Sequence, residues 1–161
     1  MKKVIFLDFD GVLLPQTFEK FMDGMHTLSN GKVQTNDKYD NLFAPHCIDY
    51  LKTIIENTNA KCVVTSQWRN SMDYDKIKEM FSYRYGNQIK IIGVTPILNG
   101  KKRGEEIAKY LKNNKVDKYV ILDDMDYSQF EDNQREYLVK CNEILGITTD
   151  EVEKSIELLN N

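Results

Sequence analysis

The chain has 161 residues, a length at which one domain can bury a core without disulfide bonds. Apolar residues make up 41% of it and charged residues 29%, which excludes a disordered chain and a collagen-like repeat. The 22 basic and 25 acidic side chains give a net charge of −3, which excludes a globally basic nucleic-acid binder but leaves room for a local basic patch.

The first residues resemble a signal peptide only superficially. Two lysines precede the apolar run Val4–Leu7, but this run is far shorter than the ~7–15 residues of a secretory segment, and an aspartate follows it. No apolar run approaches the ~20 residues of a membrane span, and the three cysteines form no CxxC pair. We therefore expect a cytoplasmic protein that binds no membrane and has neither a zinc site nor a disulfide framework.

Short apolar segments alternate with helical patterns along the chain, which predicts a parallel sheet covered by helices. The expected strands are Lys3–Phe9, Lys61–Thr65, Ile89–Gly93, Tyr119–Leu122 and Leu138–Lys140. The expected helices start at Pro45, cover Asp73–Ser82, follow Gly104 and start at Thr148, where a capping-box pattern stands. The predicted fold class is α/β, a three-layer Rossmann-like sheet of about five strands with helices on both faces.

Residues Pro15–Ala44 interrupt this alternation, since a few residues suffice to connect a strand to its helix. An Asn-Gly pair at 30–31, between Met25–Ser29 and Lys32–Thr35, is typical of a two-residue hairpin turn. We expect a small helix and a hairpin that together form a flap over the carboxyl end of the sheet. Residues 1–161 are then one domain, with 15–44 as a minimal cap insertion.

Carboxylates stand at the ends of two predicted strands. Asp8 and Asp10 come at the end of the first, where Gly11 allows a sharp turn, and Asp123 and Asp124 follow the fourth. The carboxyl ends of the strands are where open α/β sheets bind ligands. If these two strands are neighbours, the carboxylates converge and need a cation to stay ionised together. Hard oxygen ligands favour Mg²⁺, so the sequence predicts a magnesium site here.

Polar and basic side chains follow two further elements. Thr65, Ser66 and Arg69 lie at the end of the second strand, where hydroxyl, N–H and guanidinium groups can bind phosphate oxygens; for Ser66 a helix N-cap is the alternative. Three cations, Lys101, Lys102 and Arg103, precede a helix, where the macrodipole opposes positive charge, and this indicates an anionic partner. A solvated charged face is the alternative for these three residues.

These four elements, in this order, resemble the motifs of the haloacid dehalogenase-like (HAD) superfamily of phosphohydrolases. The first motif corresponds to Asp8–Val12, the second to Thr65, the third to Lys102 or Arg103, and the fourth to Asp123–Asp124. A narrower similarity exists to the HAD domain of "Swiss Army Knife" RNA repair proteins. It rests on Phe43–Cys47, Thr65–Arg69, Gly93–Pro96, Arg103–Ile107, Leu122–Asp124 and Gly146–Val152.

The chain departs from the RNA-repair group at one position and from the wider superfamily at another. The RNA-repair group usually has Ser-Ser-Trp-Arg in its second motif, whereas Gln67 precedes the tryptophan here. That group also has an arginine before Gly-Glu-Glu-Ile, as Arg103 is here, whereas the wider superfamily has a lysine in the third motif. Both Lys102 and Arg103 therefore stay candidates for the catalytic cation.

The resemblance implies a Mg²⁺-dependent phosphatase with HAD-like strand order. It implies that Asp8 is a nucleophile that forms an aspartyl-phosphate, and that Asp10 protonates the leaving oxygen. Mg²⁺ would be held by Asp8, the Asp10 carbonyl and either Asp123 or Asp124. The other expected catalytic and substrate contacts are Thr65, Lys102 or Arg103, Ser66, Arg69 and Gly11.

Two substrate classes remain open, a phosphorylated nucleic-acid end and a small metabolite or nucleotide phosphate. The RNA-repair resemblance, the small flap and the segment Asn99–Tyr119, with seven cations against three acids, favour the first. The net charge and the lack of aromatics among basic residues disfavour it. A non-catalytic phosphate- or Mg²⁺-binding module and an interaction subunit that uses Trp68 are also compatible with the sequence. No obligate protein partner is expected.

Overall fold

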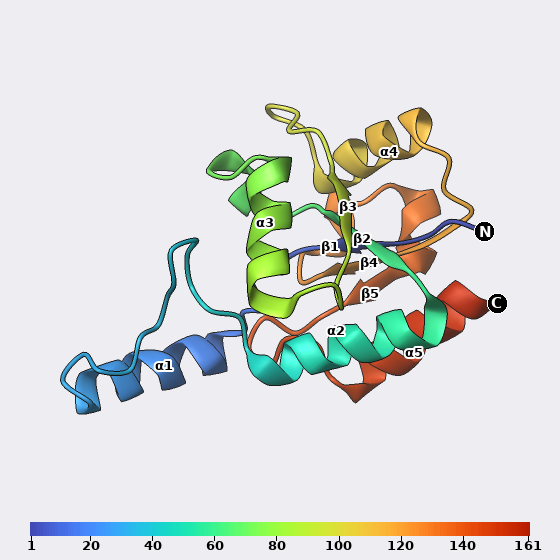
Figure 1. Ribbon diagram of the computed structural model, residues 1–161. Coiled ribbons are helices and arrows are strands. Elements are labelled where there is room, and N and C mark those ends of the chain that lie inside the picture. The colour runs from blue at the N-terminus through green and yellow to red at the C-terminus, as the bar shows by residue number, and fades with distance from the viewer.

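A five-stranded parallel sheet lies at the centre of the computed structural model, which describes residues 1–161 (Figure 1). The strands are β1 (Lys3–Leu7), β2 (Lys61–Val64), β3 (Ile91–Val94), β4 (Lys118–Asp123) and β5 (Leu138–Lys140). Their spatial order is β3-β2-β1-β4-β5, so the direction of winding reverses between β1 and β4. Such a switch point opens a crevice at the carboxyl ends of the strands, where α/β proteins bind ligands.

Helices cover both faces of the sheet, which confirms the predicted fold class. Alternate residues of β1 point to opposite faces: Ile5 and Leu7 join the larger apolar cluster, and Val4 and Phe6 join the smaller one. The helices α2 (Pro45–Thr58), α3 (Tyr74–Tyr85) and α5 (Thr149–Asn160) supply the larger cluster. On the other face lie α4 (Arg103–Asn113) and the 3₁₀ segments η2 (Tyr127–Gln129) and η3 (Asp132–Tyr137).

Local sequence signals account for most of the helix boundaries. Pro45 stands in the first turn of α2, where its missing N–H costs nothing. Before α5, the backbone N–H and the hydroxyl of Thr148 donate to the Glu151 carboxylate at 2.7 and 2.6 Å, which confirms the predicted capping box. Strand β3 begins at Ile91 rather than at the predicted Ile89. No helix combines the length and the apolar character that crossing a bilayer requires.

The predicted hairpin at residues 25–35 is wrong. Helix α1 (Gln16–Leu28) runs through the segment expected to be its first strand. Asn30 and Gly31 have φ of 51° and 79° and lie just after the end of the helix, where the Gly31 N–H donates to the His26 carbonyl at 2.8 Å. Residues with left-handed backbone end helices as readily as they form hairpin turns. The Asn-Gly pair therefore correctly indicates a left-handed backbone, but this backbone ends a helix instead of joining two strands.

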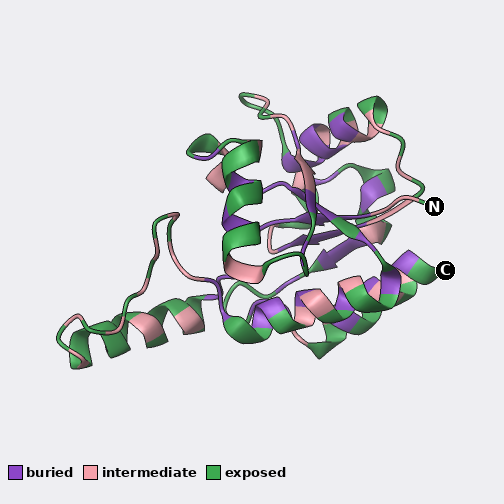
Figure 2. Cartoon of the chain, in the orientation of Figure 1, coloured by how far each residue is buried: buried purple, intermediate pink, exposed green.

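The insertion consists of a projecting helix and an anchored return segment. No residue of α1 is buried, and the helix extends away from the sheet (Figures 1 and 2). The return segment is fastened to α3, because Arg84 donates two hydrogen bonds of 2.8 Å to the Asp37 carboxylate and one of 3.0 Å to the Asp40 carbonyl. The hydroxyl of Tyr39 donates to Glu79 at 2.7 Å and adds a second attachment.

Candidate active site

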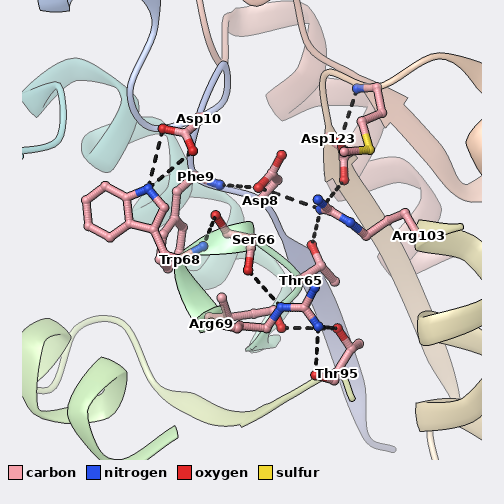
Figure 3. A network of polar contacts seen from close by, with 12 residues as sticks. Asp8, Phe9, Asp10, Thr65, Ser66, Trp68, Arg69, Thr95, Arg103 and Asp123 are labelled. Atoms are coloured by element: carbon pink, nitrogen blue, oxygen red, sulfur yellow. Dashed lines mark hydrogen bonds and ion pairs between the residues drawn. The ribbon is translucent and has the colours of Figure 1, made fainter. Parts of the chain in front are cut away.

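Three carboxylates meet at the switch point of the sheet. Asp8 follows β1, Asp123 is the last residue of β4 and Asp124 comes next; one oxygen of each lies within 4.8 Å of the others. The strands pair with Leu7 beside Leu122, and the Asp8 N–H donates to the Leu122 carbonyl at 3.0 Å, so Asp8 and Asp123 come side by side (Figure 3). The expected convergence is therefore present for Asp8, Asp123 and Asp124, whereas the carboxylate of Asp10 lies outside this group.

The cluster carries more negative than positive charge. Asp8 and Asp123 are buried. The pKa values of Asp123 and Asp124 are both raised, mainly by burial and to a smaller extent by the negative charge of Asp8. The basic group paired with them is Arg103, whose Nη1 lies 2.7 Å from Asp123 Oδ2 and 3.6 Å from Asp8 Oδ1. One guanidinium does not balance three carboxylates. Their hard oxygen atoms fit a divalent cation such as Mg²⁺, and the structure contains a group of acids that could bind one.

Of the two candidate cations, the structure brings Arg103 to the carboxylates and leaves Lys102 outside. The Arg103 side chain is 3% exposed, and its Nη1 also donates to the Thr65 hydroxyl at 3.1 Å. Lys102 is exposed, and its ammonium group donates to the Ser128 carbonyl at 2.9 Å. Consecutive residues at a helix start point in different directions, so only one of the two can face the site.

The two hydroxyl residues after β2 are placed differently. Thr65 is fully buried, its N–H donates to the Leu7 carbonyl at 2.9 Å, and its hydroxyl faces Arg103. Ser66 is the N-cap of η1 (Gln67–Asn70), and its hydroxyl accepts from the Trp68 N–H at 3.4 Å. The alternative interpretation of Ser66 as an N-cap therefore matches the geometry, while Thr65 lies with the site residues.

The Arg69 guanidinium forms several hydrogen bonds within the protein. Its Nε donates to the Ser66 carbonyl, and its Nη1 donates to the carbonyl and hydroxyl of Thr95, each at 2.7 Å. Its Nη2 donates to Glu106 at 2.8 Å, and both side chains are nearly buried. These bonds tie η1 to the end of β3 and to α4. Arg69 also lines a polar cavity beside Arg103, so its contact with a substrate stays a prediction.

Asp10 and Gly11 shape the rim of the centre. The carboxylate of Asp10 accepts from the indole N–H of Trp68, with Nε1 at 3.2 and 3.4 Å from its oxygens, and burial followed by the charge of Asp8 raises its pKa. Gly11 has a φ of 73°, and a Cβ there would collide with the carboxylate of Asp124. The glycine thus allows Asp124 to approach the turn, a role that spacing alone did not indicate.

Sequence reasoning misses three further participants. The indole of Trp68 donates to Asp10, a contact that the sequence does not indicate. It assigns no role to Thr95 and Glu106, although both accept hydrogen bonds from Arg69. Glu106 and Arg69 are both recognisable in the sequence as charged residues. They stand 37 positions apart, however, and no local pattern indicates that they pair.

A polar cavity of about 330 Å³ opens beside Arg103, between η1, η2 and the segment that joins β3 to α4. Its polar lining includes Gln67, Asn70, Asn99, Lys101 and Gln129. Ile97, Leu98 and Met125 supply apolar patches in the same wall. Arg103 belongs both to this lining and to the carboxylate centre, so the cavity lies beside that centre.

Comparison with known proteins agrees with this geometry. No curated protein and no solved structure matches the chain. The model of one family, the HAD domain in Swiss Army Knife RNA repair proteins, matches residues 4–152. This range includes β2 to β5, β1 from Val4 onward, the three carboxylates and Arg103. The chain therefore belongs to the family of HAD domains found in Swiss Army Knife RNA repair proteins.

Proposed function

We propose that this protein is a Mg²⁺-dependent phosphatase that hydrolyses phosphate monoesters through an aspartyl-phosphate on Asp8. The observation that carries the proposal is the meeting of Asp8 with Asp123, Asp124 and Arg103 at the switch point of the sheet. This set combines a nucleophile, oxygen ligands for a cation and a fixed positive charge. Membership of the HAD family supports the same class of hydrolase.

In this reaction an Asp8 oxygen attacks the phosphorus atom in line with the leaving oxygen. The Thr65 hydroxyl and the Arg103 guanidinium, which contact one another at 3.1 Å, would bind equatorial phosphoryl oxygens. Asp10 gives its proton to the leaving oxygen and then takes one from the water that hydrolyses the intermediate. Mg²⁺ held by Asp8, Asp123 and Asp124 would offset the repulsion between Asp8 and the phosphate dianion. The Asp10 carbonyl stays a predicted fourth ligand.

The test is phosphate release from a panel of monoesters with and without Mg²⁺. We expect Mg²⁺-dependent turnover by the wild type and none by Asp8→Asn, because the amide is not a nucleophile of comparable strength. Thermal melting of both proteins controls for folding. Full activity of Asp8→Asn would disprove the aspartyl-phosphate mechanism. A protein that binds Mg²⁺ but neither turns over nor traps beryllofluoride on Asp8 would be a non-catalytic binding module.

For the substrate, we propose a phosphorylated nucleic-acid end. The polar cavity beside Arg103 is lined by amides, apolar patches and Lys101, groups that can contact a base and a backbone phosphate. Its one acid, Glu106, is paired with Arg69. The other flank, beside Asp10, is acidic. The negative charge of Asp40 contributes to raising the pKa of Asp10, and that of Asp10 contributes to raising the pKa of Glu19. A polyanion is therefore better accommodated on the cavity side.

A small metabolite or nucleotide phosphate is the second candidate, because the net charge of −3 gives a polyanion no general attraction. The two are separated by comparing kcat/KM for a 3′-phosphorylated oligonucleotide with values for mononucleotides and sugar phosphates. A clear preference for the oligonucleotide supports end processing, and the reverse preference supports metabolite hydrolysis. The double variant Asn99→Ala/Gln129→Ala should lower kcat/KM only for substrates that enter the cavity.

A further inference from the structure

The carboxylate of Asp10 has a single polar partner among the side chains of the protein, the indole N–H of Trp68. Nε1 lies 3.2 Å from one oxygen and 3.4 Å from the other, so one donor spans both (Figure 3). An indole N–H donates and cannot accept. Trp68 can therefore fix the direction of the Asp10 carboxyl group without ever competing for its proton.

The orientation of the indole is set by packing, not by Asp10. Its ring meets Phe9 edge-on, with centroids 5.4 Å apart at 88°, and lies 5.3 Å from the ring of Phe43. Both phenylalanines are buried, and Phe9 stands in the chain between Asp8 and Asp10. Rotating the indole would break both aromatic contacts, which makes any other orientation unfavourable.

The backbone that carries Trp68 is also held. Ser66 caps η1, and Arg69 fastens the end of the same turn to Thr95 and Glu106 through hydrogen bonds of 2.7 and 2.8 Å. The segment Thr65–Arg69 is thus a single rigid unit. Thr65 faces the proposed phosphoryl site, Trp68 holds Asp10, and Arg69 anchors the segment to the rest of the fold.

We propose that Trp68 is a positioning residue that aims the Asp10 carboxyl group at the leaving oxygen of the substrate. This inference rests on the proposed function, in which Asp10 is the acid. As the Asp8 oxygen bonds to phosphorus, the bond from phosphorus to the leaving oxygen breaks, and the electron pair stays on that oxygen. The leaving oxygen takes the proton of Asp10, which becomes a carboxylate. Water then bonds to phosphorus as the bond from Asp8 to phosphorus breaks, which frees inorganic phosphate and the Asp8 carboxylate. The Asp10 carboxylate takes a proton from that water and is restored.

Misplacing the acid has an effect that depends on the leaving group. An alkoxide, such as that of a sugar or of glycerol, needs the proton as the bond breaks. A p-nitrophenolate is a stable anion and needs it far less. Trp68→Phe keeps an aromatic ring against Phe9 and Phe43 but removes the donor. Loss of positioning therefore slows alkyl esters selectively, whereas general damage to the site slows both classes.

We expect Trp68→Phe to lower kcat for glycerol phosphate about 10- to 100-fold, part of the roughly 10²–10⁴-fold effect of a general acid. For p-nitrophenyl phosphate we expect a loss of at most about threefold, because protonation is not required there. Phe43→Leu is the matched control, since it loosens the same aromatic packing and leaves the N–H in place. It should not reproduce the selectivity between the two esters.

The double variant Asp10→Asn/Trp68→Phe tests whether Trp68 acts through Asp10. If it does, the double variant is no slower on glycerol phosphate than Asp10→Asn alone, because the positioned proton is already absent. Equal loss on both esters, or a loss that adds to that of Asp10→Asn, overturns the inference while Asp8-dependent turnover survives. If the wild type releases no phosphate from either ester or from a 3′-phosphorylated oligonucleotide, the proposed function itself fails.

Discussion

At the scale of single residues, adjacent positions have different tasks. Lys102 and Arg103 carry the same charge and neighbour one another, yet only Arg103 contacts Asp123 and Thr65. Lys102 forms its hydrogen bond with the Ser128 carbonyl on the surface. A basic side chain in the third motif is thus insufficient by itself, since its direction decides whether it reaches the carboxylate centre.

Arg103→Ala should lower kcat/KM about 10²- to 10³-fold, the range for removing one donor that stabilises transition-state charge. It also leaves the charges of Asp8 and Asp123 without their basic partner. Lys102→Ala is the matched control and should stay within about twofold on small esters. Phosphate release measured on both variants decides the question, and an equal loss in both would contradict the assignment to Arg103.

At the scale of elements, a mostly buried ion pair between Arg84 and Asp37 helps attach the return segment of the insertion to α3. Hydrogen bonds from Arg84 hold the pKa of Asp37 at about 2, below its ordinary value of 3.8. A group whose pKa is lowered in the folded state stabilises that state when ionised. This contribution is complete above about pH 4 and disappears as the pH falls toward 2.

Asp37→Asn should lower the free energy of unfolding at pH 7 by about 1–3 kcal/mol, because Arg84 loses a charged partner. Chemical denaturation from pH 7 to about pH 3 should show the difference between wild type and variant shrinking below pH 4. The exposed pair of Asp132 and Arg135 is the control, and Asp132→Asn should change stability by less than about 0.5 kcal/mol. A difference that stays constant down to about pH 3 would refute the role of this pair.

At the scale of the whole molecule, the carboxylate centre joins the two halves of the sheet. Asp8 follows the central strand, and Asp123 and Asp124 belong to the half that contains β4 and β5. Repulsion between these carboxylates destabilises the contact between the two halves of the sheet, and a cation bound there reduces that repulsion. Ligand binding to the folded state alone also stabilises that state by mass action.

Mg²⁺ should therefore raise the melting temperature. At a concentration about 100 times its Kd, the gain is about 2.7 kcal/mol, or several degrees for a chain of this size. Asp124→Asn should reduce the shift sharply, whereas Asp126→Asn, which only caps η2, should retain it. An equal Mg²⁺ shift in wild type and Asp124→Asn would place the cation elsewhere.

Local patterns in the chain were enough to predict the strands, the paired carboxylates and the capped helices. These patterns are apolar runs of strand length, acids directly after them, and capping residues at helix starts. The convergence of Asp8 with Asp123 was conditional on β1 and β4 being neighbours, and the sheet order meets that condition.

The roles of the remaining side chains depend on three-dimensional packing. Asn30-Gly31 signals left-handed backbone, which a hairpin turn and a helix end share, so local sequence could not choose between them. Arg69 meets Thr95 across 26 positions of the chain, and Trp68 meets Asp10 across 58. Contacts between such distant residues depend on how the strands and loops pack, and that packing leaves no trace in the spacing of any one segment.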